Sequence, residues 1–215
     1  MEILLRDYLG NFGAGLAITG RLTAVSFVAA VVLGTLLALC RISPVRPLRA
    51  FGLAYVEVFR NVPLFSLLIL VVYGLPELEV DIGYIPSVIL AMTAVGAAFA
   101  CEVVRTGINS IGADQVQAAR SIGLTFAGIA RHVVVPQAIR NTVQPIVSLF
   151  ISILLSSSLA GVVGVMDLTA QVSYINNREA LGLVTFLVAA ALYAGIALGA
   201  GALGAAVEDR VRVKR

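Results

Sequence analysis

Charged residues are scarce in this chain. Only 13% of its 215 residues are Asp, Glu, Lys or Arg, whereas 60% are hydrophobic. A soluble domain carries about 25% charged residues, so this chain has too few charges to cover a water-facing surface. The composition therefore excludes a soluble enzyme and a disordered chain. It also excludes a nucleic-acid-binding module, although the formal net charge is +3.

Histidine and cysteine are scarce as well. His132 is the only histidine, and the two cysteines, Cys40 and Cys101, both lie inside apolar runs. This scarcity argues against a His-ligated metal site and against a disulfide framework. The sequence also lacks the glycine-rich phosphate-binding motif of P-loop ATPases. We therefore expect no metal, no cofactor and no catalytic residue in this chain, so that any ATP hydrolysis takes place in another chain.

Five long apolar segments dominate the sequence. Because backbone amides cannot remain unpaired in lipid, each segment is expected to form a helix, and about 20 apolar residues suffice to cross a bilayer. The sequence therefore predicts an all-α integral membrane protein, with a single transmembrane domain over residues 1–215. The five predicted transmembrane helices run from about Leu22 to Cys40, Leu53 to Leu75, Ile85 to Val104, Ile139 to Val165 and Leu181 to Val207.

The charges between the spans predict an orientation. Basic residues lie in the cytoplasm by the positive-inside rule, which places the N-terminus outside and the C-terminus in the cytoplasm. Arg6 and Arg21, before the first span, run against this assignment. The basic residues are Arg41, Arg46 and Arg49 after the first span, Arg105, Arg120, Arg131 and Arg140 after the third, and Arg210, Arg212, Lys214 and Arg215 at the end; the acidic residues Glu77, Glu79 and Asp81 follow the second span.

The predicted cytoplasmic loop over residues 106–137 contains a short helix of its own. Gly112 and Gly123 bracket the stretch Val116–Ile122, which consists of good helix formers on a helical period. One interpretation is a docking surface for a soluble partner. The other is a helix that lies on the membrane interface. The residues alone leave both open.

This loop also carries a motif. Gln117-Ala118-Ala119, three residues, Gly123, nine residues and Val133-Val-Val-Pro136 resemble the Glu-Ala-Ala loop of ABC importer permeases. Gln117 replaces the usual glutamate and removes a charge, and valines replace an isoleucine and a leucine. The resemblance implies a coupling helix in a groove of a cytoplasmic ATPase. It assigns coupling to Gln117, Ala118, Ala119, Arg120, Gly123 and Pro136.

Three more stretches extend the resemblance to residues 13–209. Tyr55–Leu64 resembles the second-helix motif of polar amino acid permeases, Cys101–Ile111 their third-helix exit, and Ser158–Thr169 the end of their fourth helix. Within that family the chain is most similar to actinobacterial glutamate permeases. The resemblance implies the type I ABC importer permease fold and an ATP-driven importer for a polar amino acid, first of all glutamate, in the plasma membrane of a bacterium.

The same resemblance implies several partners. They are a second permease chain, like or unlike this one, a cytoplasmic ABC ATPase dimer that binds ATP and Mg, and an extracytoplasmic substrate-binding protein. The chain itself is then not an enzyme. The alternatives are a membrane-embedded enzyme, which needs a cluster of ionisable residues at one depth, and a stand-alone channel, which leaves the coupling loop without a role.

Two acid–base pairs lie near the predicted cytoplasmic ends of their spans. Glu57 and Arg60 are three residues apart, as are Glu102 and Arg105, so each pair can meet on one helix face. Charges at membrane depth cost about 2.5–3.5 kcal/mol each on insertion scales. The four residues therefore form either a gate that exchanges partners between states or ion pairs that anchor the helix ends.

A stripe of small residues follows the fourth span at intervals of four. Its serines are Ser148, Ser152 and Ser156, and Ala160 and Gly164 continue it. Serines on one face suit an aqueous path for a zwitterion. A small-residue stripe equally suits close packing against a neighbouring helix, and the sequence leaves both interpretations open.

Overall fold

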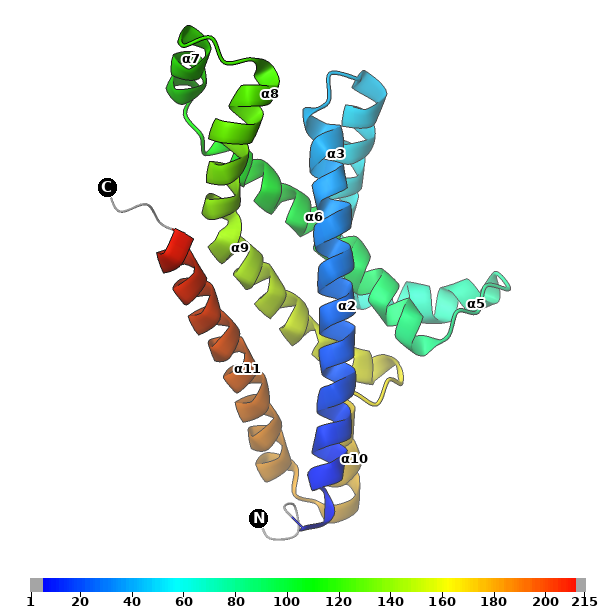
Figure 1. Cartoon of the computed structure of the whole chain (residues 1–215). Helices are drawn as coiled ribbons and strands as arrows, with labels where there is room; N and C mark the ends of the chain where they lie inside the picture. Colours follow the sequence, from blue (N-terminus) through cyan, green and yellow to red (C-terminus); the bar gives the residue numbers. More distant parts are fainter. Residues whose placement is uncertain (1–5, 212–215) are drawn as a thin grey trace.

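A computed structural model describes residues 6–211, and the prediction of an all-α membrane protein is confirmed (Figure 1). Within these residues, four helical runs are long and apolar enough to cross a membrane, and the number is five when the bent pair Arg46–Asn61 and Leu64–Glu77 is taken as one span. The described elements are α2 Leu9–Ile42, α3 Arg46–Asn61, α4 Leu64–Ile69, the π-helix η1 Leu70–Gly74, α5 Leu75–Glu77, α6 Tyr84–Asn109, α7 Ala113–Ser121, α8 Phe126–Ile129, the π-helix η2 Ala130–Val134, α9 Val135–Ser156, the 3-10 helix η3 Ser157–Val163, α10 Leu168–Glu179 and α11 Gly182–Val211.

The predicted second span is not a single straight helix. The chain bends by 101° between Arg46–Asn61 and Leu64–Glu77. The bend lies at Val62, which is extended with ψ 126° and immediately precedes Pro63. A proline disfavours helical backbone at the residue before it, so α3 ends there and α4 sets out in a new direction.

The two π-helical segments each end two residues before a proline. Gly74, at the end of η1, precedes Pro76, and Val134, at the end of η2, precedes Pro136. A proline has no N–H to donate to the carbonyl four residues earlier, and a π-turn is one way in which a helix accommodates such a gap. Both helical runs continue through their prolines for this reason.

Close packing of α2 against α6 forms the centre of the molecule. A Cβ on Gly34 would lie 2.4 Å from the Cβ of Ala100 and 2.7 Å from the carbonyl oxygen of Ala97. Gly96 approaches Ala30 in the same way, with 2.9 Å between the corresponding Cβ positions. Small residues at these points let the two backbones meet, as in other membrane helix pairs.

The first long helix, α2, begins at Leu9, not at about Leu22 as predicted. Glycines in its first half obscured this start in the sequence. One of them has a packing role, because a Cβ on Gly15 would lie 2.9 Å from the Cα of Leu168 in α10. Thr19 reinforces this contact, since its hydroxyl accepts a hydrogen bond of 3.1 Å from the Leu168 backbone N–H.

Asp167 caps the N-terminus of α10. Its Oδ1 accepts a hydrogen bond of 2.8 Å from the Ala170 backbone N–H, and the residue is fully buried. Burial raises the pKa of the Asp167 carboxyl to about 6, although the amide hydrogen bonds oppose that shift. The capped helix and its contacts with α2 fix the end of the molecule opposite α7 (Figure 1).

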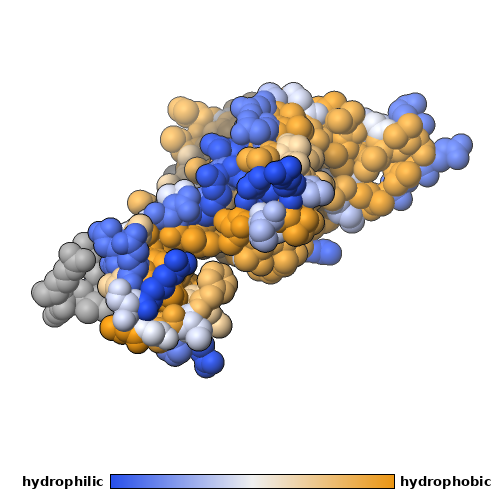
Figure 2. Space-filling view, turned by 90° about the horizontal axis from the view of Figure 1, so that it is seen from above, coloured by the Kyte–Doolittle hydropathy of each residue, from blue (hydrophilic) through white to orange (hydrophobic). Residues whose placement is uncertain are grey.

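The loop predicted over residues 106–137 is largely helical. The third span continues to Asn109 at its start, and the fourth helical run begins at Phe126. Only the connections on either side of α7 are non-helical. Viewed from this end, hydrophilic residues gather on the end face while hydrophobic residues cover the flanks (Figure 2).

Candidate functional site

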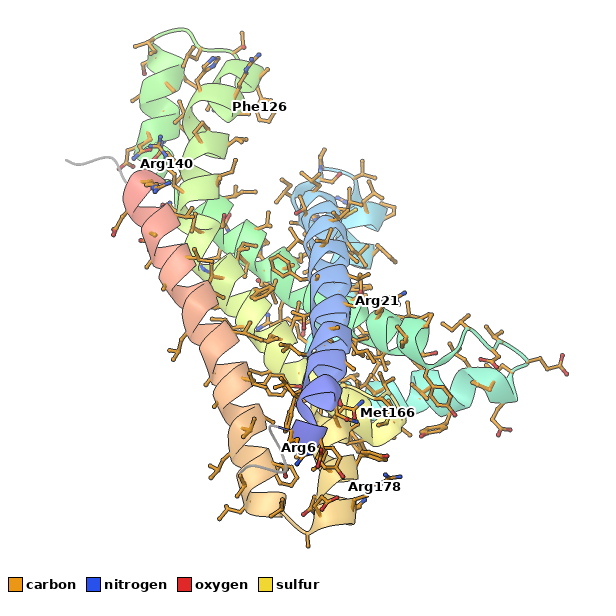
Figure 3. All side chains as sticks on the ribbon, turned by 60° about the horizontal axis from the view of Figure 1, so that its bottom comes forward. Arg6, Arg21, Phe126, Arg140, Met166 and Arg178 are labelled. Atoms are coloured by element: carbon orange, nitrogen blue, oxygen red, sulfur yellow. The ribbon has the colours of Figure 1, made fainter. Side chains whose placement is uncertain are left out.

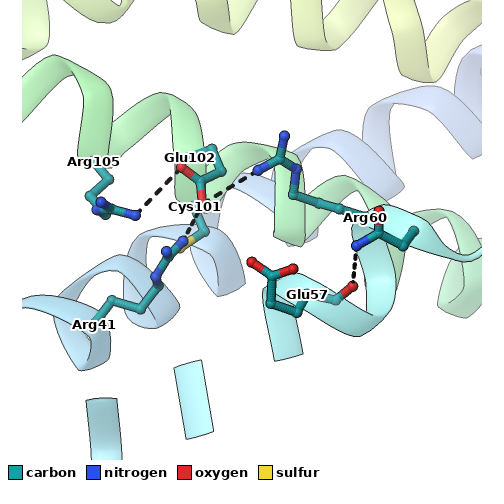
Figure 4. Close-up of polar contacts among 7 residues, drawn as sticks. Arg41, Glu57, Arg60, Cys101, Glu102 and Arg105 are labelled. Carbon is teal, nitrogen blue, oxygen red and sulfur yellow. Dashed lines mark hydrogen bonds and ion pairs between the residues drawn. The ribbon is translucent and has the colours of Figure 1, made fainter. Parts of the chain in front are cut away.

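Three arginines surround one carboxylate where α2, α3 and α6 meet (Figure 4). Arg41 Nη1 donates to Glu102 Oε1, and Arg60 Nη1 lies 3.6 Å from the same oxygen. Arg105 Nη1 lies 3.7 Å from the other oxygen, Oε2. We call these four residues the Glu102 cluster. It links three helices through one acidic side chain.

The three arginines differ in how far they are buried. The Arg41 side chain is only 7% exposed, whereas that of Arg60 is 44% exposed. Arg41 also approaches the buried Cys101 Sγ at 4.0 Å, and Arg60 lies over the Phe99 ring, 5.7 Å from its centroid. Arg41 is therefore an internal member of the cluster, and Arg60 faces outward.

The predicted pairing of these charges is only half right. The Glu102–Arg105 pair forms, but no ion pair between Glu57 and Arg60 occurs among the described residues. Because the chain bends just after Asn61, Arg60 reaches Glu102 on α6 instead. The Asn61 side chain donates a 2.6 Å hydrogen bond to the Glu57 backbone carbonyl.

The sequence reasoning did not assign Arg41 to this site. It was counted as a loop charge because it follows an apolar run. Helix α2 in fact continues to Ile42, so Arg41 projects from the last turn of a membrane-spanning helix towards Glu102. One signal in the sequence could have indicated this role. Arg41 directly follows Cys40, and Cys40 still lies inside the apolar run of the first span.

Two clefts adjoin the Glu102 cluster. The first, here the Glu102 cleft, has a volume of about 460 Å³ and is lined by Glu102, Ser148 and Ser152 among others. The second, the Arg60 cleft, has a volume of about 230 Å³ and is lined by Arg60, Ser152 and Ser156 among others. Ser152 lines both clefts. The three predicted path serines therefore border open space beside charged side chains.

The small residues that follow Ser156 do not lie on the same helix face as the serines. Helix α9 ends there, and the chain continues as the tighter 3-10 helix η3. This change of period turns Ala160, which is fully buried, away from the serine row. Gly164 adopts a left-handed conformation with φ 95°. The serines and the two later small residues thus lie in different surroundings.

The predicted coupling residues lie on α7 and just after it, except Pro136, which lies in α9. Gln117, Ala118 and Arg120 are exposed, but Ala119 is only 6% exposed because it packs within this chain. Its carbonyl accepts a 3.2 Å hydrogen bond from the Leu124 backbone N–H. Ala119 is therefore buried within this chain itself, unlike the three coupling residues beside it.

Gly123 and Pro136 both have a backbone role. Gly123 has φ 83°, a conformation that glycine adopts without a steric penalty. Its N–H donates a 2.9 Å hydrogen bond to the Arg120 carbonyl, which closes the end of α7. Pro136 lies in the first turn of α9, within a helical run that begins at Phe126, ahead of the predicted start of the fourth span at about Ile139.

Two large apolar side chains near α7 are exposed. Ile122 is 79% exposed and Phe126 is 83% exposed, and Phe126 lies at the opposite end of the molecule from Arg6 and Arg178 (Figure 3). The sequence reasoning did not single out either residue. Burial of such side chains is worth roughly 1.5–3 kcal/mol each, so they form a candidate contact surface for a soluble partner.

Metal-binding chemistry finds no support in this site. Among residues 6–211 there is no group of three or more His, Cys, Asp or Glu side chains placed to hold a metal ion. What the arrangement offers is two clefts that share Ser152, one with Glu102 and the other with Arg60 as the charged residue on its wall. Such a site can bind and release a small polar solute.

Comparison with known sequences gives a consistent result. Residues 30–213 match the family described as "Binding-protein-dependent transport system inner membrane component". The "Probable glutamine ABC transporter permease protein GlnM" of Bacillus subtilis is 30% identical over 88% of both chains. The "Arginine transport system permease protein ArtQ" of the same organism is 31% identical over 92% of this chain and 91% of its own. The "Glutamate transport system permease protein GluC" of Corynebacterium efficiens is 31% identical over 92% of both.

Solved structures share the same fold. A chain from the "Crystal structure of an amino acid ABC transporter with histidines" superposes with a TM-score of 0.92, at 30% identity and with 97% of both chains covered. A chain of the inward-facing MetNI methionine ABC transporter superposes with a TM-score of 0.78, over 97% of this chain and 99% of its own, at 22% identity. The second comparison concerns the fold alone.

Proposed function

The chain belongs to the family of binding-protein-dependent transport system inner membrane components, and we propose that the amino acid it transports is glutamate. It is the permease subunit of an amino acid ABC importer, a multi-pass membrane protein and not itself an enzyme. Glutamate is supported by the similarity to glutamate permeases of Corynebacterium along 92% of the chain. Relatives named for glutamine and arginine are as similar, so the substrate needs its own test.

The observation that best supports transport by this chain is the pair of clefts beside the Glu102 cluster. Three serines line these clefts, Ser148, Ser152 and Ser156. Their hydroxyls can form hydrogen bonds with a zwitterionic amino acid that has lost its hydration water. The cluster ties α2, α3 and α6 together, so rearrangement of its ion pairs changes how these helices pack. We assign Arg60, Glu102 and Arg105, with Arg41, to this gate, whereas Glu57 has no ion pair within residues 6–211.

Coupling belongs to α7 and the start of α8. In this proposal the exposed residues Gln117, Ala118 and Arg120 lie against a cytoplasmic ATPase dimer, which binds ATP and Mg. Gly123 sets the angle between α7 and α8, and Pro136 stiffens the helical run that carries the motion to the serines. The complete importer also contains a second permease chain and an extracytoplasmic binding protein, in the plasma membrane of a bacterium.

Uptake by the complete importer tests the substrate. The permease, its ATPase, its permease partner and its binding protein are reconstituted in proteoliposomes that contain ATP. Labelled L-glutamate is then offered alone and with a hundredfold excess of glutamine, arginine or cystine. We expect ATP-dependent glutamate uptake that unlabelled glutamate suppresses and the other amino acids do not. Stronger uptake of glutamine or arginine would reassign the substrate, and failure to take up any amino acid would reject the proposed function.

A further inference from the structure

The connection between α2 and α3 carries positive charge and no negative charge. Residues 22–56 contain no Asp or Glu, and their basic residues are Arg41, Arg46 and Arg49. Arg41 belongs to the Glu102 cluster, whereas Arg46 and Arg49 form no ion pair with another residue of the described range. The charge of these two arginines is therefore not compensated within residues 6–211.

Residues 43–53, here the α2–α3 corner, form a short turn and the first half of α3. The turn is ordered by the Ser43 hydroxyl, which accepts a 3.2 Å hydrogen bond from the Val45 backbone N–H. Arg46 and Arg49 follow in the first turn of α3 and are both exposed. Because they are three residues apart on a helix, their side chains can meet on one face.

One small residue holds the corner against the end of α2. A Cβ on Gly52 would lie 2.8 Å from the Cγ of Arg41 and 3.2 Å from the Leu37 carbonyl oxygen. Since α2 is a candidate membrane span that ends at Ile42, the corner lies where the chain leaves the bilayer. It is at the same end of the molecule as α7 (Figure 1), which the basic connections place in the cytoplasm.

Large apolar side chains are exposed beside the two arginines. They are Val45, Leu48, Phe51 and Leu53. Phe51 is the most exposed of them, at 61%, and its ring centroid lies 6.4 Å from that of Tyr55. Arginines interspersed with Leu and Phe at the end of a span are typical of a helix in the interface between lipid headgroups and acyl chains.

We propose that the α2–α3 corner binds anionic phospholipid. Arg46 and Arg49 contact the headgroup phosphate, and the acyl chains lie against Leu48 and Phe51. Guanidinium groups bind phosphate through charge-assisted, often bidentate hydrogen bonds, and the cytoplasmic leaflet supplies anionic lipid to basic segments at its surface. A soluble anion would leave the apolar neighbours exposed to water, so a lipid is the ligand that matches both parts of the corner.

Lipid at this corner also affects α3 as a whole. Arg60, near the other end of α3, belongs to the Glu102 cluster, and a lipid that holds the first turn of α3 limits how far the helix shifts when the cluster exchanges ion pairs. This consequence rests on the proposed gate. The binding of lipid itself does not.

Native mass spectrometry of the purified permease–ATPase complex tests the binding. The delipidated complex is titrated in detergent with phosphatidylglycerol, or with phosphatidylcholine of the same acyl chains, which has no net charge. We expect wild type to prefer phosphatidylglycerol. The double variant Arg46→Gln, Arg49→Gln should bind phosphatidylglycerol roughly tenfold or more weakly, because each basic residue near the surface raises affinity about fivefold. Its binding of phosphatidylcholine should be unchanged.

The double variant Arg131→Gln, Arg140→Gln is the matched control. Both arginines are exposed in the helical run from α8 to α9 and form no ion pair within the described residues, so the same net charge is removed elsewhere. Its affinity for phosphatidylglycerol should stay within about threefold of wild type. Equal losses in the two double variants would overturn the proposal, as would a wild-type complex without preference between the lipids.

Two further results would identify a different ligand. Displacement of phosphatidylglycerol from wild type by millimolar glycerol 3-phosphate would mean that the corner binds a free phosphate group. Loss of the ATPase from the variant with Arg46→Gln and Arg49→Gln, with phosphatidylglycerol still bound as in wild type, would mean that the corner contacts the ATPase. Either result overturns the lipid proposal, and neither depends on which amino acid the complete importer takes up.

Discussion

Individual glycines show how closely this fold is packed. Gly34 lies where α2 meets α6, and an added Cβ would lie 2.8 Å from the backbone nitrogen of Cys101 as well as against Ala97 and Ala100. Gly20 lies in the same helix on an exposed face, with no atom within 4 Å of its Cβ position. The two positions therefore separate packing from helix propensity.

Gly34→Ala is expected to destabilise the protein by about 1–3 kcal/mol, the usual cost of overpacking a well-filled interior. Gly20→Ala should leave stability unchanged or raise it, because alanine favours a helix over glycine by about 0.5–1 kcal/mol. The measurement is the temperature at which half of the detergent-solubilised protein remains monodisperse. Equal midpoints for the two variants would mean that α2 and α6 are not in close contact at Gly34.

At the scale of helices, α7 and α8 form a small unit with a buried and an exposed side. Ala119 and Ile129 are buried, at 6% and 5% exposure, whereas Ile122 and Phe126 are largely exposed. Ile122 lies between the candidate spans Tyr84–Asn109 and Phe126–Val163, and Phe126 is the first residue of the later one. This side of the unit is where a cytoplasmic partner gains most from contact.

Phe126→Asp should prevent association with the ATPase while the permease still folds. Phe126 is the first residue of α8, where an acidic side chain is compatible with the helix dipole, so the variant should fold. At the contact with the ATPase, the carboxylate of the new aspartate would be buried without a partner. Ala127→Asp is the control, since it places the same charge on the neighbouring exposed residue without removing a large apolar side chain. Co-purification with the ATPase measures the effect. Full retention of the ATPase by Phe126→Asp would contradict this assignment.

The sequence was sufficient for the number, order and type of the long helices, because hydropathy and backbone pairing in lipid determine them. It was not sufficient for the bend at Pro63, since a proline in an apolar run is compatible with either a kinked or a broken helix.

The sequence also did not predict the Glu102 cluster. The i,i+3 rule covers neighbours on one helix, whereas Arg41 and Arg60 reach Glu102 from two other helices. Such contacts depend on tertiary packing.

The molecule as a whole has two distinct ends. Residues Arg6 and Arg178 lie at one end, and Arg140 and Phe126 lie at the other (Figure 3). Arg21, which ran against the predicted orientation, is not a loop residue, because α2 extends over it from Leu9. Arg212, Lys214 and Arg215, which supported a cytoplasmic tail, lie outside the described residues. The remaining basic connections still favour placing α7 in the cytoplasm.

Thiol labelling of whole cells tests this orientation. Glu77→Cys and Arg210→Cys are made singly in a Cys40→Ala, Cys101→Ala background that still supports amino acid uptake. Glu77 is exposed at the end of α5, and Arg210 is exposed near the end of α11, so both thiols are accessible from their own side of the membrane. Because acidic connections lie outside and basic ones inside, we expect a membrane-impermeant maleimide to label Glu77→Cys in intact cells, and Arg210→Cys only after permeabilisation.

The reverse labelling pattern would mean that the molecule has the opposite orientation in the membrane. It would place α7, Ile122 and Phe126 outside the cell, where no ATP-hydrolysing partner can reach them, so the coupling role assigned to this surface depends on the result.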